Sequence, residues 1–595
     1  MSDIHYLIEL PDPKTHVFQI TLTVPAPAAA QQLSLPAWIP GSYLLREFAR
    51  HLSGLSASQG GRPLALEQLD KANWQVTCSG AEDLVLSYQV YAFDSSVRAA
   101  FLDAHRGFFN GTGLCLRVHG REHAAHAIAL GALPAAWQVA TAMTQTSPGR
   151  YLAANYDELV DHPFELGQFW QGEFMADGVP HKIVVSGALP VFDGERLLAD
   201  AQRICAAQLA FWHGPVATRK SPAPFKHYIF FLNAVEDAYG GLEHRASTAL
   251  IAPRRDLPRW GQTELGEGYV RLLSLISHEY FHSWNVKRLK PDAFAELDYA
   301  RENYTELLWF FEGFTSYYDE LLLRRCGLID EARYLKLLTS HFNSVLATPG
   351  RKLQSLAQSS FDTWVKYYRP DENSPNSTIS YYTKGALLAL ALDLSLRSLD
   401  TAGCNLDDVM RELWRRSHAG AQCGAGAMTE ADVLAVISEL AGSALAEQFG
   451  QWVHGTDDLP LPPLFERFGV QLREDKPSLA QRLGLRVSES GAGATSSCSV
   501  KQVLVGSAAL AAGLCAGDEL LACNGWRIRR LEEAVLTLAQ GTMTLDLLVS
   551  RDQRLLNLTA HLPGSAAGRN EPVLLALAEK PSEAAASLRK AWLAG

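Results

Sequence analysis

The sequence HEYFHSWNVKRLKP occupies residues 278–291 and carries the strongest signal in the chain. Apolar residues at helical spacing predict a helix over 269–287. On such a helix His278 and His282 are four positions apart and share one face, so both imidazoles can reach one ion. Glu279 follows the first histidine and can project into the same cleft. With 18 histidines in 595 residues, chance would supply only about 0.03 such HExxH matches.

A second segment supplies a third candidate ligand. Residues 307–325 read as another apolar helix, in which Glu312 lies among bulky apolar neighbours. A buried carboxylate is costly unless it is paired or binds a metal. Two histidines and one carboxylate are a ligand set that suits zinc, with a fourth position open for water. We therefore predict that His278, His282 and Glu312 hold one Zn²⁺ per chain; the alternative is a glutamate on a solvated helix face.

The totals of the sequence limit the class of protein. A chain of 595 residues is long enough for about three to five domains. Its net charge of −11 argues against nucleic acid and membrane surfaces as partners, because both favour basic faces. Neither a secretory signal nor a membrane-spanning apolar run is visible. Nine scattered cysteines favour free thiols in a reducing compartment, so we expect a cytoplasmic protein.

Periodicity divides the chain into a β-rich beginning, a mixed middle and a β-rich end. Residues 16–24 alternate apolar and polar side chains, which predicts a half-buried strand. Strands are expected to continue from 171 to about 260 and to give way to helices, which indicates an α+β core. The Pro- and Asp-rich stretch 455–463 is a predicted linker. The predicted segments are a β domain at 1–170, a catalytic core at 171–460, a β domain at 465–563 and a tail at 564–595.

Two long segments carry a resemblance to a known family. HEYFHSWNVKRLKP, together with LLWFFEGFTSYY at 307–318, resembles the gluzincin metallopeptidases and, within them, the glycyl aminopeptidase family. The loop WIPGSY at 38–43 is similar to a loop of that family's N-terminal domain. The resemblance implies a multidomain fold with an N-terminal β-sandwich-like domain, an α+β thermolysin-like catalytic core and a C-terminal PDZ domain.

The same resemblance implies a substrate anchor. Residues 239–244 read YGGLEH and are similar to the GxMEN-type motif of gluzincin aminopeptidases. In that motif the glycines let the backbone approach the substrate and the glutamate binds its free α-amine. The matching residues are Gly240, Gly241 and Glu243. Leu and His stand where the motif often has Met and Asn, and a plain Gly-Gly turn with a solvated glutamate is the alternative.

The segment YYTKG at 381–385 resembles the YxKG motif of these enzymes. The resemblance aligns Tyr382 with a tyrosine that donates a hydrogen bond to the oxyanion of the tetrahedral intermediate, a contribution of a few kcal/mol. Tyr381 is adjacent and could be mistaken for it, and both could be packing aromatics.

The C-terminal module resembles a bacterial PDZ domain through the sequence at 503–524. Asn524-Gly525 is a strong hairpin signal. Such domains bind a peptide strand and its carboxylate, here at a loop around Gly484. A PDZ domain that only packs against the core is the alternative.

Together these features predict a zinc aminopeptidase. Glu279 would act as general base and Tyr382 as oxyanion donor, on peptides with a free N-terminus. The resemblance implies a preference for small N-terminal residues such as Gly or Ala. Two alternatives remain: a zinc endopeptidase on the same core, and a catalytically silent PDZ scaffold.

Overall fold

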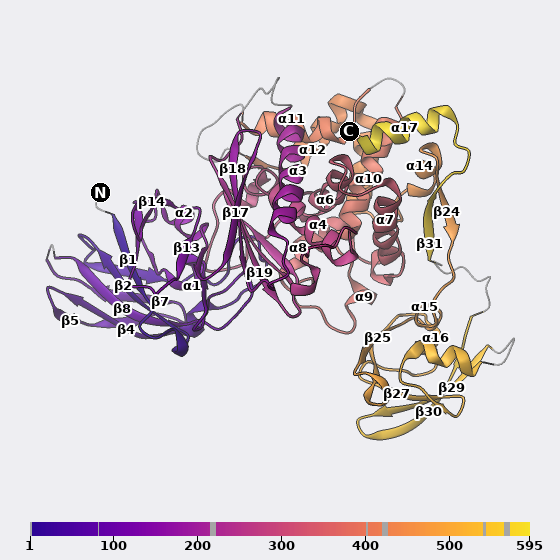
Figure 1. The fold of residues 1–595 in the computed structure, drawn as a ribbon, viewed down its shortest axis with the longest axis horizontal. Coiled ribbons are helices and arrows are strands. Elements are labelled where there is room, and N and C mark those ends of the chain that lie inside the picture. The colour runs from indigo at the N-terminus through magenta and orange to yellow at the C-terminus, as the bar shows by residue number, and fades with distance from the viewer. Residues whose placement is uncertain are drawn as a thin grey trace. The chain divides into compact units, whose positions relative to one another are not determined.

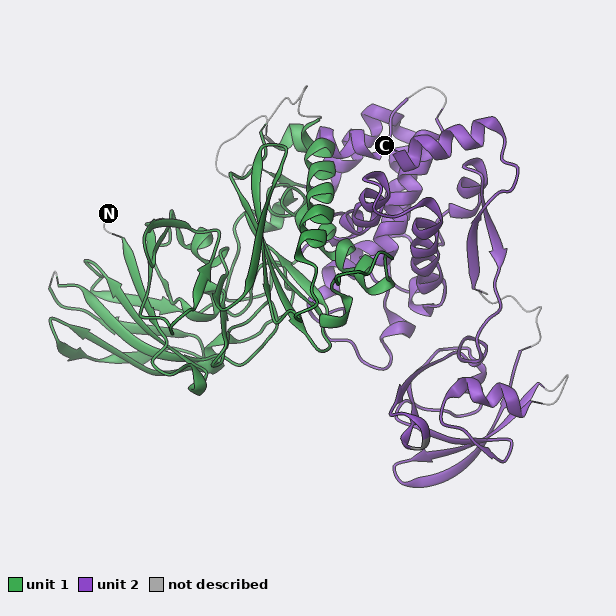
Figure 2. Cartoon of the chain, viewed as in Figure 1, with its two compact units in different colours: residues 1–304, 414–428 green, residues 305–413, 429–595 purple. Residues whose placement is uncertain are grey.

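The computed structural model describes residues 3–80, 82–214, 222–399, 403–418, 426–538, 543–563 and 572–594. The chain divides into two compact units (Figure 2). The first holds residues 1–304 and 414–428, and the second holds residues 305–413 and 429–595. This grouping by contacts is a different division from the four segments predicted from the sequence, and the boundaries of those segments stay a prediction.

The first unit begins with β-sheets, which confirms the β-rich N-terminal domain. In β2 every second side chain is buried and the others lie half-buried, as the alternation over 16–24 predicts. The largest sheet has the strand order β14-β15-β12-β1-β2-β8-β4-β5. Its strands are β1 Ile4–Glu9, β2 Val17–Val24, β4 Leu52–Gln59, β5 Arg62–Leu64, β8 Leu84–Tyr91, β12 His126–Leu130, β14 Thr144–Ser147 and β15 Arg150–Ala153.

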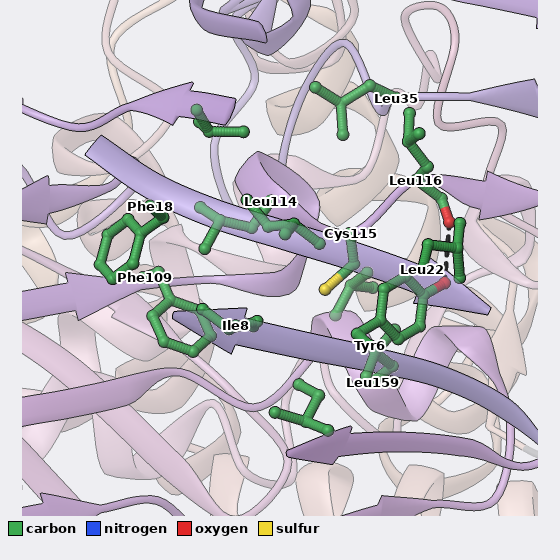
Figure 3. Close-up of a cluster of buried hydrophobic side chains, with 14 of the residues drawn as sticks. Tyr6, Ile8, Phe18, Leu22, Leu35, Phe109, Leu114, Cys115, Leu116 and Leu159 are labelled. Atoms are coloured by element: carbon green, nitrogen blue, oxygen red, sulfur yellow. Dashed lines mark hydrogen bonds between the residues drawn. The ribbon is translucent and has the colours of Figure 1, made fainter. Parts of the chain in front are cut away.

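Two four-stranded sheets and two short helices complete this β-rich region. The strand orders are β13-β16-β10-β9 and β11-β3-β7-β6. Apolar side chains from several of these elements form one buried cluster, in which the Tyr6 hydroxyl donates to the Leu116 carbonyl at 2.8 Å (Figure 3). The elements are β3 Ala30–Ser34, β6 Leu66–Gln68, β7 Asn73–Thr77, β9 Phe101–Leu102, β10 Arg106–Phe109, α1 Gly111–Leu114, β11 Arg117–Val118, β13 Gln138–Ala140, α2 Tyr156–Val160 and β16 Phe164–Gly167.

A five-stranded sheet in the same unit carries part of the site. Its order is β17-β18-β19-β21-β20. The pairs β18/β19 and β19/β21 are parallel, whereas β17/β18 and β20/β21 are antiparallel. The short strand β20 therefore lies at an edge. The strands are β17 Trp170–Ala176, β18 Val179–Ser186, β19 Tyr228–Val235, β20 Gly240–Glu243 and β21 Ser247–Pro253.

The strands expected between 171 and 260 are present, but the sequence did not lead us to expect the helix among them, α3, which spans Gly194–His213. A parallel crossover from β18 to β19 needs a long connection, and α3 supplies it. Asp193 caps this helix by accepting from the Arg196 amide at 3.0 Å. Helix α4, Glu267–Phe281, packs against both β20 and β21. A two-stranded pair, β22 Lys290–Pro291 with β23 Ala427–Met428, also belongs to this unit.

The second unit holds most of the helices (Figure 1), so the middle of the chain contains both the strands and the helices that an α+β core predicts. Its central pair is α6 and α10, which cross in close contact. Helix α11, Leu406–His418, runs across the boundary of the two units. The other helices are α5 Leu308–Phe311, α6 Gly313–Arg325, α7 Glu331–Leu346, α8 Leu356–Phe361, α9 Ser374–Ser377, α10 Thr383–Arg397, α12 Glu430–Ala441, α13 Ser443–His454 and α14 Leu461–Arg467.

The C-terminal module that resembles a PDZ domain forms its own sheet with its own buried core. The strand order is β25-β26-β27-β29-β30, with β28 paired to β27. Asn524 and Gly525 both have positive φ, which is the geometry of the two-residue hairpin turn that their sequence predicts. The elements are α15 Leu479–Leu483, β25 Leu485–Ser490, β26 Ser497–Val503, α16 Ala508–Ala511, β27 Glu519–Cys523, β28 Trp526–Arg527, β29 Thr544–Arg551 and β30 Arg554–His561.

The described residues after this module pack against the helices of the second unit. Strand β31, Val573–Leu577, pairs with β24, Val470–Glu474, and packs on α7. Helix α17, Glu583–Ala594, buries Trp592 completely. The indole nitrogen of Trp592 donates to the Tyr317 hydroxyl at 2.9 Å. The predicted tail is therefore an integral part of the helical packing.

Two further expectations concern the cellular setting. No helix in the described part of the chain combines the length and apolar character that a membrane crossing needs. Eight of the nine cysteines lie in the described residues, and none of these eight is in a disulfide; six are buried, Cys326 is partly buried and Cys515 is exposed. The cytoplasmic location stays a prediction.

Candidate active site

The two histidines of the HExxH motif lie at the end of α4. His278 is in the last turn and His282 is the C-cap residue, so the helix is shorter than the predicted 269–287. Both still lie on one face, with their Nε2 atoms 3.1 Å apart. Two Zn–N bonds of about 2.0–2.1 Å at a tetrahedral angle place their nitrogens about 3.3 Å apart. The pair therefore already has the spacing that zinc requires.

The residues after the motif fix the orientation of His282. Its Nδ1 donates to the Asn285 carbonyl at 2.8 Å, which leaves the Nε2 lone pair available to a metal. Val286 has a φ of 109°, a conformation that a β-branched residue rarely adopts. The Val286 amide donates to the Leu289 carbonyl at 2.8 Å and holds this turn. The motif's WNV segment thus has a structural role that the sequence alone does not reveal.

Glu312 lies at a break between two helices, so the single helix predicted over 307–325 is wrong. It ends α5 and caps α6, and it is only 2% exposed. The break lies where a glycine meets another backbone: a Cβ on Gly313 would come within 2.6 Å of the Gly385 Cα. Because both positions are glycine, α6 and α10 can cross closely. That crossing draws Glu312 towards Tyr382, which caps α10.

The three predicted ligands offer donor atoms that are close enough together to hold one metal ion. One ligand atom each from His278, His282 and Glu312 can be chosen so that all lie within 4.8 Å of one another. Among the residues that the structure describes, this is the one such group of three or more. Two imidazoles and a carboxylate are the donor set of catalytic zinc sites, which keep a further position open. The donor chemistry and the spacing both fit zinc.

Glu279 packs directly onto β20. It is 5% exposed, and a Cβ built on Gly241 would lie 2.1 Å from its Oε1. Gly241 therefore leaves the space that the Glu279 carboxylate fills. Gly240 has a φ of 155°, and a Cβ there would approach the Arg98 guanidinium at 3.6 Å. Arg98 donates to the Gly241 carbonyl at 3.0 Å, a contact from the N-terminal β region that the sequence reading missed.

Glu243 is the last residue of β20 and is also 5% exposed. The solvated glutamate considered from the sequence is therefore wrong. Its carboxylate lies against Gly41 of the WIPGSY loop, since a Cβ on Gly41 would be 2.5 Å from Glu243 Oε2. Glu243 also borders a cavity of about 130 Å³. The walls of this cavity include Trp38, Tyr43, Asp161, Lys287, Phe294 and Tyr299.

A largely buried ion pair lines this cavity. Asp161 lies 2.8 Å from the Lys287 ammonium and accepts from the Arg245 amide at 2.9 Å. His244 Nδ1 is 3.3 Å away from the same carboxylate. Burial alone would raise the pKa of Asp161, but Lys287 and His244 hold that pKa well below its usual range. Asp161 thereby ties the residues after Glu243 to the turn after the HExxH helix.

The two adjacent tyrosines have different environments. Tyr381 is fully buried, and its hydroxyl lies 2.8 Å from Thr363 Oγ1. Tyr382 is half-buried at the start of α10. Burial and the nearby Glu312 carboxylate raise the pKa of Tyr382, so its hydroxyl stays protonated and can donate. The structure thus separates a packing tyrosine from one that is more accessible.

Comparisons with known proteins agree with this site. Residues 5–168 match the Peptidase M61 N-terminal domain, residues 271–388 match M61 glycyl aminopeptidase, and residues 471–550 match the PDZ domain. No curated protein matches the chain.

One solved structure is similar over the whole chain. It is the aminopeptidase N family protein from Idiomarina loihiensis, which is 36% identical, with 99% of this chain and 100% of that chain covered and a TM-score of 0.91. The M1 zinc metallopeptidase from Deinococcus radiodurans is more distant. It is 16% identical, with 77% of this chain and 94% of that chain covered, and its TM-score of 0.47 is too low to support an inference. The chain therefore belongs to the M61 glycyl aminopeptidase family and is a zinc metallopeptidase with a C-terminal PDZ domain.

Proposed function

We propose that this peptidase removes single residues from peptides with a free N-terminus, and that it prefers small residues such as Gly or Ala. The observation that carries the proposal is the position of Glu243. Its buried carboxylate ends the strand whose Gly241 packs against Glu279. One strand thus holds both an anion for a substrate amine and the neighbour of the candidate base. This arrangement favours cleavage next to a free amino terminus.

Each residue has a distinct role in the proposed reaction. Glu279 accepts a proton from the attacking water and passes it to the leaving amine. Tyr382 donates a hydrogen bond to the oxygen that becomes negative in the transition state. Glu243 pairs with the α-ammonium group and sets the position of the scissile bond. When bound, zinc would polarise the carbonyl and lower the pKa of water.

We infer that one zinc binds per chain, at His278, His282 and Glu312. The support is the 3.1 Å spacing of the two Nε2 atoms and the burial of Glu312. His282→Ala should lose the metal while Glu279→Gln keeps it, as measured by metal analysis of the purified proteins. A His282→Ala protein with a full equivalent of zinc would place the metal elsewhere.

The preference for small residues is supported by the space beside Glu243. The cavity there is about 130 Å³, and its walls include the rings of Trp38, Tyr43 and Phe294. A panel of aminoacyl substrates tests the preference. We expect kcat/KM to fall from Gly and Ala to Leu and Phe; equal values along the series would contradict it.

We also infer that the PDZ domain binds a peptide carboxylate. Gly484 has a φ of 72° and caps α15 directly before β25, a strand at the edge of the PDZ sheet. An edge strand can accept a further strand, and the preceding turn can hold a carboxylate. Titration with peptides that carry a free or an amidated C-terminus tests this. Equal binding of both forms would contradict the carboxylate role.

The central experiment compares free and N-acetylated forms of one peptide. Acetylation removes the charge that Glu243 would bind, so the free form should be cleaved far better. Glu243→Ala should weaken cleavage of the free form and leave the acetylated form little changed. Efficient cleavage of the acetylated peptide by the wild type would support an endopeptidase instead.

A further inference from the structure

The WIPGSY loop meets the substrate anchor at a single glycine. Gly41 has a φ of 90°, and an ideal Cβ on it would lie 2.5 Å from Oε2, 2.6 Å from Oε1 and 2.7 Å from Cδ of Glu243. These distances are far below ordinary van der Waals contact, so no side chain fits there. We propose that Gly41 is a positioning residue: the backbone of the N-terminal loop lies against the oxygen end of the Glu243 carboxylate and sets where it binds the substrate amine.

The three distances indicate which part of the carboxylate is covered. They differ by only 0.2 Å, so the Cβ position is almost equally far from both oxygens and from the carbon between them. Because both oxygens are nearer than the carbon between them, this point lies at the oxygen end of the group, roughly midway between the two oxygens. The lone pairs of a carboxylate lie in its plane. Contact at this end limits where the two oxygens can lie and leaves the outer lone pair of each oxygen for a donor such as an ammonium group.

The loop around Gly41 is firmly held. The Trp38 indole nitrogen donates to the Asp298 carbonyl at 2.8 Å, and the Arg46 guanidinium donates to Ser42 Oγ at 2.8 Å. Ile39 and Ser42 pair across the turn. Ile39 and Leu242, the residue before Glu243, are buried in the same apolar cluster. The loop and the strand thus have little freedom to move apart.

An added methyl group at Gly41 should therefore displace the carboxylate and not the loop. The end of a glutamate side chain moves at little cost, whereas the loop and the strand are packed. The change should cost little more stability than any alanine at positive φ. It should cost much more in kcat/KM, which a displacement near 1 Å at a positioning group can lower by up to about 10²-fold; because Glu243 binds the amine, the loss should fall mainly on KM. This inference rests on the proposed role of Glu243.

Gly120 offers a matched control. Its φ is 81°, close to that of Gly41, and a Cβ there would meet nothing within 4 Å. Gly120→Ala thus carries the backbone strain without the clash. For a free aminoacyl substrate, we expect Gly41→Ala to raise KM at least 10-fold, with kcat within about 3-fold of the wild type. Gly120→Ala should leave both constants unchanged, and both variants should lower Tm by a similar amount.

A double-mutant cycle then shows whether Gly41 acts through Glu243. If it does, adding Gly41→Ala to Glu243→Ala should raise KM less than 3-fold further. A full additional 10-fold increase would overturn the inference, as would an unchanged KM in Gly41→Ala. A Gly41→Ala protein that fails to fold when Gly120→Ala folds would overturn it too, because the cost would then not be confined to one side chain. The proposed function fails separately, if Glu243→Ala itself leaves KM unchanged.

Discussion

Gly241→Ala tests how closely the general base depends on the edge strand. A Cβ at this position would lie 2.1 Å from Glu279 Oε1 and 2.3 Å from its Cδ. Ordinary contact begins near 3.4 Å, so the carboxylate would have to retreat by about 1.3 Å. A displacement of that size from the reacting groups costs about 10²-fold in rate. Because the amine anchor is on another residue, the loss should appear in kcat and leave KM within a few-fold.

Gly266→Ala is the matched control for this prediction. Gly266 caps the same helix that carries Glu279, and a Cβ there would meet only the Gln262 amide at 3.8 Å. The assay is steady-state cleavage of a glycyl substrate, with zinc content and Tm measured on the same samples. We expect Gly241→Ala to keep zinc, fold and KM but to lose about 10²-fold in kcat. Wild-type kcat in this variant would refute the assigned packing of Glu279, and loss of zinc would show that the site itself had collapsed.

Three further predictions concern other parts of the chain. Tyr382→Phe should lower kcat about 10²- to 10³-fold, because that is the usual cost of losing one oxyanion donor. Tyr381→Phe should keep kcat within about 3-fold of the wild type. The reverse pattern would exchange the roles of the two tyrosines. Trp592→Ala should lower the free energy of unfolding in urea by about 3–5 kcal/mol. Trp526→Ala, at a side chain that is 70% exposed, should change it by under about 0.5 kcal/mol. Equal effects of the two changes would contradict the packing of the C-terminal helix. Burial lowers the pKa of His181 to about 4, below the value of about 6.5 in an unfolded chain. As the pH drops from about 6.5 towards 4, the unfolded state therefore binds a proton before the folded state does, and the free energy of unfolding should fall. A His181→Gln variant that loses the same stability between pH 7 and 5 would exclude His181 as a cause.

The metal ligands could be predicted from the sequence because their geometry is local. His278 and His282 are related by one helical turn, which fixes their common face whatever surrounds the helix. Glu312 was predictable from the cost of burying an unpaired carboxylate among apolar residues. The break in the helix at Glu312 was not predictable, because it accompanies the contact of Gly313 with Gly385, more than 70 positions away in sequence.

Helix α3 was missed although its local signals are present. Asp193 is a good N-cap, and Leu197, Ala201 and Ile204 follow at helical spacing. The sheet topology requires a long connection at this point, because β18 and β19 are parallel and consecutive parallel strands are joined by a crossover.

The contacts that position the carboxylates depend on tertiary structure. Gly41 lies against Glu243, and Arg98 bonds to the Gly241 carbonyl, across separations of more than 140 residues. A motif resemblance shows that these residues occur together but not which of them touch. The glycines of the YGGLEH segment illustrate the point: Gly241 provides space for Glu279, a role that the resemblance does not contain.

The most direct test of the account is the turnover of Glu279→Gln per bound zinc. Zinc content and kcat are measured on one preparation, beside the wild type. The account predicts about one zinc per chain in both proteins and a kcat that is about 10²- to 10⁴-fold lower in the variant, because glutamine cannot accept the proton of the attacking water. A zinc-loaded Glu279→Gln enzyme within threefold of the wild type would contradict the assignment of Glu279 as the general base.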